Sequence, residues 1–125
     1  KFVDQISRGL PVKQYGDGTS SRDYTYVDDI VDGIILTLDK PLGYQVYNLG
    51  KGSATPLNTF ITLIEKYTNK SANISKQPQQ AGDVPYTCAN INKAKEMLGY
   101  QPKVSVEEGL AKMIAWYGEV YGKAI

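Results

Sequence analysis

Two residue types that build covalent cross-links and metal sites are almost missing from this sequence. It contains one cysteine, Cys88, and no histidine among its 125 residues. A single cysteine cannot form an internal disulfide, and without histidine or a second cysteine there is no ligand set for a zinc site. We therefore expect a protein with no metal site, made in a reducing, cytoplasmic compartment.

The sequence also lacks an excess of charge and a long apolar run. Its 14 Lys and Arg residues balance 13 Asp and Glu residues, for a formal net charge of +1. A balanced chain has no positive field to hold a nucleic acid backbone. The longest apolar stretch, around Ile34, Ile35 and Leu36, is too short to cross a bilayer. We expect neither nucleic acid nor a membrane as a partner.

What is present suits one folded domain. Hydrophobic residues make up 42% and charged residues 22% of the chain, close to ordinary globular usage. The first residue is Lys1, and the segment after it already reads as the body of a helix, with Phe2, Val3 and Ile6 on one face. We expect residues 1–125 to form a single domain that is a fragment of a longer protein.

The spacing of apolar residues predicts an α/β domain in which several helices surround a few short strands. Alternation predicts strands at 12–15, 44–49 and 72–76, and helical spacing predicts helices at 2–9, 27–38, 55–68, 90–98 and from 105 onward. Thr55 and Pro56 are typical of a helix start, Asn90 of a cap, and Ser105 with Glu108 of a capping box. A loop rich in Gln, Pro and Gly is predicted at 77–88.

Two segments imitate motifs of nucleotide-dependent enzymes. The sequence Gly-Lys-Gly-Ser-Ala-Thr at 50–55 lies between a predicted strand and helix, but Thr55 replaces the third glycine of a dinucleotide fingerprint. Tyr47 and Lys51 have the Tyr-x-x-x-Lys spacing, yet a loop between them would not place both side chains on one helical face. We interpret the first as an ordinary turn and the second as a coincidence, and we predict neither catalytic residues nor a cofactor site.

The loop before the second predicted helix carries the strongest candidate site. Arg22 lies in a run of Gly, Ser and Thr, where a guanidinium, hydroxyls and amides could hold a phosphate. Alternatively, Arg22 pairs with Asp23, Asp28 or Asp29 and only fixes the loop. The residues themselves leave both interpretations open. Trp116 and its helical neighbours are interpreted as core or partner-facing residues.

The sequence Tyr-Gly-Asp-Gly-Thr-Ser-Ser-Arg-Asp-Tyr-Thr-Tyr-Val-Asp-Asp at 15–29 resembles the nucleotide-sugar epimerases and dehydratases of the extended short-chain dehydrogenase family. Segments 44–50, 80–85, 98–102 and 108–117 follow in the family's order and spacing, so the resemblance covers essentially the whole chain. Gln80, ahead of Ala-Gly-Asp, makes the chain most similar to UDP-glucuronate 4-epimerases.

This resemblance implies substrate-binding roles for six residues. Arg22 resembles the arginine that contacts the diphosphate of a UDP-sugar. Tyr15 matches the aromatic position beside the uracil, with Gln14 in the same pocket. Asp83 matches the loop acid near the ribose, and Gln80 lies close to it. The last candidate, Asn48, is equally readable as a strand-end residue that satisfies its own turn.

The resemblance also implies what the chain does not contain. In such enzymes an amino-terminal Rossmann domain binds NAD and carries the catalytic Tyr and Lys. Residues 1–125 would then be the carboxy-terminal, substrate-binding part, inactive alone, with strands and helices that complete a Rossmann-type sheet. Its partners would be a UDP-sugar and the missing NAD-binding domain, and exposed apolar surface could lead to self-association. The alternative is a free-standing, non-catalytic module that binds a nucleotide or a protein.

Overall fold

The computed structural model describes residues 1–122 as five helices and four short strands. The helices are α1 (Phe2–Ser7), α2 (Val27–Asp39), α3 (Leu57–Thr68), α4 (Asn92–Leu98) and α5 (Val106–Tyr121). The strands are β1 (Pro11–Tyr15), β2 (Ser21–Arg22), β3 (Thr55–Pro56) and β4 (Asn73–Gln77). This arrangement confirms the predicted α/β class. No helix in residues 1–122 has the length and apolar character that crossing a membrane requires.

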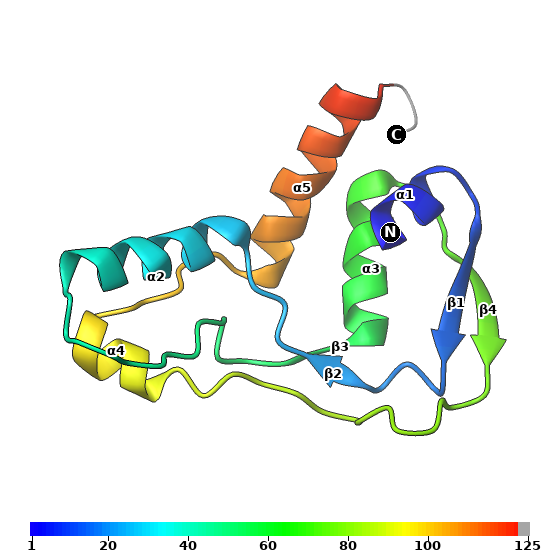
Figure 1. Ribbon diagram of the computed structural model, residues 1–125. Helices are drawn as coiled ribbons and strands as arrows, with labels where there is room; N and C mark the ends of the chain where they lie inside the picture. The colour runs from blue at the N-terminus through cyan, green and yellow to red at the C-terminus, as the bar shows by residue number, and fades with distance from the viewer. Residues whose placement is uncertain (123–125) are drawn as a thin grey trace.

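The strands form two small sheets. β1 and β4 are parallel, with Pro11 opposite Asn73 and Tyr15 opposite Gln77. β2 and β3 are antiparallel, with Arg22 opposite Thr55. Figure 1 shows the β1–β4 pair beside α1 and α3, and the shorter β2–β3 pair at the foot of α3. The β2–β3 pair therefore lies between the β1–β4 sheet and the part of the molecule that contains α2 and α4.

The chain buries two separate groups of apolar side chains. The larger core lies among α1, β1, α3 and α5, and its members are Val3, Ile6, Val12, Ile61, Ile64, Leu110, Ile114 and Tyr117. The smaller core gathers around α4, with members Ile91, Ala94, Leu98 and Tyr100, and Leu36 of α2 packs against it. Figure 1 shows these regions at opposite ends of the molecule, with β2 and β3 between them.

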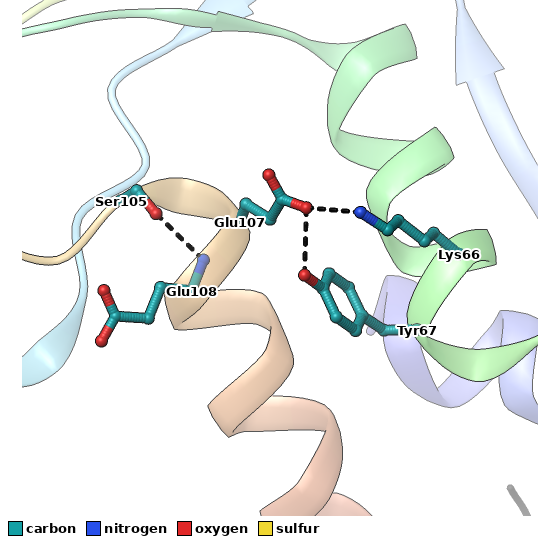
Figure 2. A network of polar contacts seen from close by, with 5 residues as sticks. All are labelled: Lys66, Tyr67, Ser105, Glu107 and Glu108. Atoms are coloured by element: carbon teal, nitrogen blue, oxygen red, sulfur yellow. Dashed lines mark hydrogen bonds and ion pairs between the residues drawn. The ribbon is translucent and has the colours of Figure 1, made fainter.

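Helix ends follow the local signals in the sequence. The Ser105 hydroxyl accepts a hydrogen bond from the Glu108 amide at 3.1 Å, which caps α5 (Figure 2). The Glu108 carboxylate itself pairs with Lys112 at 2.8 Å. Asn69 and Gly99 end α3 and α4 in the left-handed conformation that closes many helices. The Ser105 half of the predicted capping box is thus confirmed, while the Glu108 side chain turns to Lys112.

Two predictions about helix starts need correction. α3 begins at Leu57, because Thr55 and Pro56 pair with β2 as β3, so Thr55 is not its cap and Pro56 precedes its first turn. The residue that caps α4 is Ile91, although the Asn90 side chain still accepts from the Asn92 amide at 3.1 Å. Strand pairing moved the start of α3, and the start of α4 differs from the predicted one by a single residue.

The predicted strand at 44–49 is wrong for the described chain. These residues have no regular structure, and Tyr44 is 93% exposed. A strand needs a neighbour to pair its backbone N–H and C=O groups, and within residues 1–122 no strand lies along this segment. The Val46 carbonyl accepts instead from the ammonium of Lys93 at 3.0 Å.

The apolar face of α2 is mostly uncovered. Periodicity correctly predicts the helix, but its stripe remains between 45% and 75% exposed at Val27, Val31, Ile34, Ile35 and Leu38. Buried positions of α2 are instead Asp29 and Gly33. A contiguous apolar stripe on a helix is typical of a surface that meets another part of a protein.

Candidate functional site

The candidate site is organised around the contact between Arg22 and Asp83. The Arg22 Nη2 atom donates to Asp83 Oδ1 at 2.7 Å, and Nη1 donates to the carbonyl of Ser21 at 2.9 Å. Both charged side chains retain 31% exposure, so they remain within reach of solvent. A guanidinium has further N–H donors, which are the groups that bind phosphate oxygens.

Asp83 reaches Arg22 because residues 83–89 run alongside the strand that carries it. We call residues 83–89 the strap. The Ser21 amide donates to the Pro85 carbonyl at 2.8 Å, and the Thr87 amide donates to the Ser21 carbonyl at 3.1 Å. Figure 1 shows this part of the chain leaving β4 and passing β2 and β3 on its way to α4. The predicted loop is confirmed, and it is held in place by backbone bonds.

The β1–β4 pairing places the other predicted residues at the same end of the sheet. Tyr15 ends β1 opposite Gln77, and the next amide, of Gly16, donates to the Gln77 carbonyl at 3.0 Å. Gln14 is 6% exposed, and its side-chain amide lies 3.5 Å from the Gly16 carbonyl. Since Gln77 opens the loop that leads to the strap, Tyr15 and Gln14 lie at the start of that loop.

Gln80 shapes the turn just before Asp83. Its carbonyl accepts a hydrogen bond from the Asp83 amide at 3.2 Å, while its side chain is exposed. Asn48 is found at the opposite end of the strap, where its side-chain amide donates to the Asn90 carbonyl at 3.4 Å. The structure thus brings Arg22 and Asp83 into direct contact, sets Gln80 beside Asp83, and places Asn48 beyond residue 89.

Arg22 does pair with a carboxylate, as the second interpretation expected, but the partner in the described residues is Asp83 and not Asp23, Asp28 or Asp29. Asp23 and Asp29 both use their carboxylates to accept backbone amides, and the bonds to Asp29 come from Lys103 at 2.8 Å and Val104 at 3.0 Å. Consecutive residues of an extended chain point to opposite sides, so Arg22 and Asp23 face different neighbours. The charge partner of Arg22 is Asp83.

Asp23 is the polar residue of this region that sequence reasoning did not assign to the site. Its Oδ1 accepts from the amide of Lys51 at 2.9 Å and from the hydroxyl of Thr25 at 3.0 Å. Its Oδ2 accepts from the amides of Gly52 at 2.9 Å and Ala89 at 3.1 Å. In the sequence, only its position directly after Arg22 pointed to a role for Asp23, because its backbone partners are far away along the chain.

The environment of Asp23 favours its charged form. Burial acts to raise its pKa, but the hydrogen bonds from the amides of Lys51, Ala89 and Gly52 outweigh that effect. The net result is that the pKa of Asp23 is lowered from its ordinary value. A carboxylate that stays ionised keeps both oxygens available as acceptors.

The two motif imitations do not form the sites that they resemble. Because the amides of Lys51 and Gly52 donate to Asp23, the turn at 50–55 does not present them to a pyrophosphate. The Tyr47 hydroxyl lies 4.0 Å from the sulfur of Met97, whereas the Lys51 ammonium donates to the Pro102 carbonyl at 3.3 Å. These residues therefore fit neither an NAD phosphate cradle nor a catalytic Tyr-Lys pair.

An apolar groove is lined by residues that follow Arg22 in the chain, beginning with Tyr24. Its volume is about 560 Å³, and it is lined chiefly by Tyr24, Tyr26, Phe60, Val106, Met113 and Trp116. The Tyr24 ring stacks on Phe60 with 3.9 Å between ring centres. Burial raises the pKa of Tyr24, and the nearby charge of Arg22 lowers it in part. The groove thus begins within electrostatic reach of the Arg22 guanidinium.

Comparison with known proteins identifies the class to which this fold and site belong. The family model of GDP-mannose 4,6 dehydratase matches residues 1–113. The chain therefore belongs to this family of NAD-dependent epimerases and dehydratases. Within that family it is close to the UDP-glucuronate 4-epimerases. The resemblance inferred from residues 15–29 and the later segments is confirmed.

One similar protein is the UDP-glucuronate 4-epimerase of Thermodesulfobacterium geofontis, 41% identical over 120 residues that cover 95% of this chain and 37% of the relative. The Bacillus cereus UDP-glucuronic acid 4-epimerase, in complex with UDP-glucuronic acid and NAD, matches with a TM-score of 0.87 and 31% identity. The match covers 96% of this chain and 39% of that one.

The UDP-glucose 4-epimerase of Thermotoga maritima, in complex with UDP-glucose, gives the same TM-score of 0.87 at 36% identity. That comparison covers 96% of this chain and 38% of the epimerase. The chain thus spans well under half the length of the relatives that it matches, including the first curated ones.

Proposed function

We propose that this chain is the substrate-binding part of an NAD-dependent nucleotide-sugar epimerase that acts on UDP-glucuronate or a closely related UDP-sugar. The observation that carries the proposal is the contact of Arg22, in β2, with Asp83 of the strap. Relatives with this fold form complexes with UDP-glucuronic acid or UDP-glucose. Residues 1–125 would form one domain of that enzyme, which would act in the cytoplasm.

In this proposal each residue has a binding role. The fixed positive charge of Arg22 meets the diphosphate, and its planar group of donors suits two phosphate oxygens. Tyr15 offers its ring face to the uracil, and Gln14 lines the same pocket. Asp83 accepts from the ribose hydroxyls beside Gln80. Asn48 would bind the substrate at the edge of the site, beyond the end of the strap. None of these groups is assigned a bond-breaking step, so the chain binds and orients its substrate.

NAD would be held by another part of the parent enzyme. Relatives of the chain are known in complex with NAD, and NAD would accept and return the hydride during epimerisation. Residues 1–122 offer no fitting cradle, because the one glycine-containing turn that resembles it has its amides bound to Asp23. The chain alone is therefore expected to be inactive.

The uncovered apolar surface supports a missing partner domain. The α2 stripe and the groove beside Tyr24 together leave many large apolar side chains in contact with solvent. Burying such surface is the main driving force for association between protein parts. An amino-terminal NAD-binding domain packed on the α2 stripe would cover it. Without that domain, copies of the chain would associate with one another through the same stripe.

The test of this function uses the intact protein that contains residues 1–125. Incubation with UDP-glucuronate should produce its 4-epimer, detected by proton NMR of the sugar, whereas the isolated chain should give no product. Failure of the intact protein to bind or convert either UDP-glucuronate or UDP-glucose would contradict the proposal. Binding of UDP without any conversion would instead favour a non-catalytic nucleotide-binding module.

A further inference from the structure

The strap is held at both ends by side chains of two adjacent residues. At one end, Arg22 binds the carboxylate of Asp83 at 2.7 Å. In the middle, Ser21 exchanges backbone bonds with Pro85 and Thr87. At the other end, the Asp23 carboxylate accepts the amide of Ala89 at 3.1 Å. The fastened positions are therefore 83, 85, 87 and 89, every second residue of an extended segment.

Asp23 fixes the strap to a second loop as well. The amides of Lys51 and Gly52 donate to the same carboxylate, each at 2.9 Å. Gly50 lies directly against this junction, since a Cβ atom there would come within 2.6 Å of Ala89 Cβ and 2.9 Å of Asp23 Oδ2. The loop at 50–52, the strap and β2 are thus packed around one carboxylate without room for another methyl group.

We propose that Asp23 is a positioning residue of the candidate nucleotide site, whose carboxylate anchors the strap so that Asp83 meets Arg22. The proposal rests on the proposed function, in which Arg22 and Asp83 contact the UDP-sugar. Asp23 itself faces the backbone amides on the other side of the extended chain. It acts on the ligand through its neighbours.

The substitution Asp23→Asn separates this role from simple space filling. An asparagine has nearly the same shape, but one carboxylate oxygen becomes an NH2 group that donates instead of accepting. If the NH2 group faces Gly52 and Ala89, it meets two backbone donors and the strap loses its acceptor. If it faces the Lys51 amide, Ala89 keeps an acceptor, but that oxygen is neutral and binds more weakly than a charged one. The end of the strap should be held less firmly in both cases.

Asp29→Asn is the matched control. Like Asp23, Asp29 accepts backbone amides, those of Lys103 and Val104, and it is the more buried of the two carboxylates. Its partners lie outside the strap and outside the loop at 50–52. A general loss of fold stability would affect both variants, whereas a positioning effect on the nucleotide site would appear only in Asp23→Asn.

The experiment measures two quantities on the intact protein and both variants. Amide hydrogen exchange, followed by mass spectrometry, reports how firmly residues 83–89 are held. Calorimetric titration with UDP reports the affinity of the site. We expect Asp23→Asn to speed exchange in the strap and weaken UDP binding, each roughly tenfold or more, as loss of bonds to a charged acceptor predicts. Asp29→Asn should change exchange near residues 103–104 only.

Unchanged strap exchange and UDP affinity in Asp23→Asn would overturn the proposal, as would equal losses in both variants. If the intact wild-type protein binds no UDP, the proposed function fails, and hydrogen exchange alone still decides whether Asp23 anchors the strap. Should Asp23→Asn not fold, Ala89→Pro removes the strap's own amide donor, and its ring also adds atoms beside Gly50. That variant should show the same faster exchange and weaker binding, and wild-type values for both would overturn the proposal.

Discussion

The guanidinium of Arg22 and the carboxylate of Asp83 meet at 2.7 Å although 61 positions separate them in the sequence. The pair closes one end of the strap against β2. Both groups also keep about a third of their side-chain surface exposed, at 31% each. A pair that is charged, held and still accessible is suited to binding a polar ligand.

Arg22→Lys should weaken UDP binding by the intact protein more than it weakens the fold. A lysine keeps the charge but loses the planar group of donors, which we expect to cost roughly tenfold in affinity. The free energy of unfolding should fall by less than about 1 kcal/mol, since partly exposed ion pairs contribute little. Titration calorimetry and urea unfolding provide the two values.

Arg8→Lys is the control for that substitution. Arg8, which follows α1, forms a looser pair with Asp4 of that helix at 3.6 Å, with side chains 58% and 39% exposed. Its replacement should leave UDP affinity unchanged. An equal loss of affinity in both variants would show that Arg22 has no special role in binding.

Ser105→Ala should destabilise the isolated chain by about 1 kcal/mol, the usual cost of removing a helix cap. The Ser105 hydroxyl accepts the amide of Glu108 at 3.1 Å, and alanine offers no acceptor for that amide. Urea unfolding followed by circular dichroism gives the change. Ser71→Ala, at an exposed position between α3 and β4, should have no measurable effect. Equal midpoints for the two variants would contradict the capping role.

Glu107→Gln should reduce stability at neutral pH but not in strong acid. Glu107 accepts from the Lys66 ammonium at 2.7 Å and from the Tyr67 hydroxyl at 3.0 Å, which joins α5 to α3 (Figure 2). The bond from Lys66, followed by that from Tyr67, lowers the pKa of Glu107 below its ordinary value. Its contribution is therefore fully present above the unfolded pKa and is lost as the pH falls through the folded pKa.

Thermal unfolding of the wild type and of Glu107→Gln at pH 7 and near pH 3 checks this dependence. The difference in melting temperature should shrink in acid, as the wild-type carboxyl becomes protonated. Glu119→Gln, on an exposed part of α5, should match the wild type at both pH values. A difference for Glu107→Gln that is the same at both pH values would contradict an ionic contribution.

Ile35→Asp should reduce self-association of the isolated chain. Ile35 lies on the α2 stripe and is 48% exposed, so a charge there interrupts the apolar surface without opening a core. Light scattering over a range of concentrations should show a smaller mass than for the wild type. Thr59→Asp adds the same charge to an exposed position of α3 and should change nothing. A wild-type chain that stays monomeric at high concentration would contradict the proposed association.

Local patterns in the sequence predicted the helices and failed where pairing decided the outcome. α2, α3 and α5 carry apolar residues at helical spacing, which is information contained within each segment. The segment 44–49 alternates like a strand, but a strand exists only when a neighbour accepts its bonds, and Tyr44 is 93% exposed here. Thr55 was similarly predicted to start a helix but belongs to β3, because it pairs with Arg22.

The same limit applies to the candidate site. The family resemblance pointed to Arg22 and Asp83 separately, yet their contact depends on the course of the strap, which no local pattern describes. The role of Asp23 was hidden for the same reason, because its donors come from residues 51, 52 and 89. Any residue type can supply a backbone amide, so the residues that bind such a carboxylate cannot be recognised from their type or spacing in a single sequence.

The parallel pairing of β1 with β4 also fixes when the site can exist. Pro11 pairs with Asn73 across a segment that includes α2 and α3, and closing so long a loop is entropically costly and slow. The placement of Tyr15 opposite Gln77 depends on that closure, and the contact of Arg22 with Asp83 depends on the strap. Under the proposed function, UDP would bind only the chain in which this pairing and the strap are complete, so added UDP should stabilise the finished fold against partly folded forms.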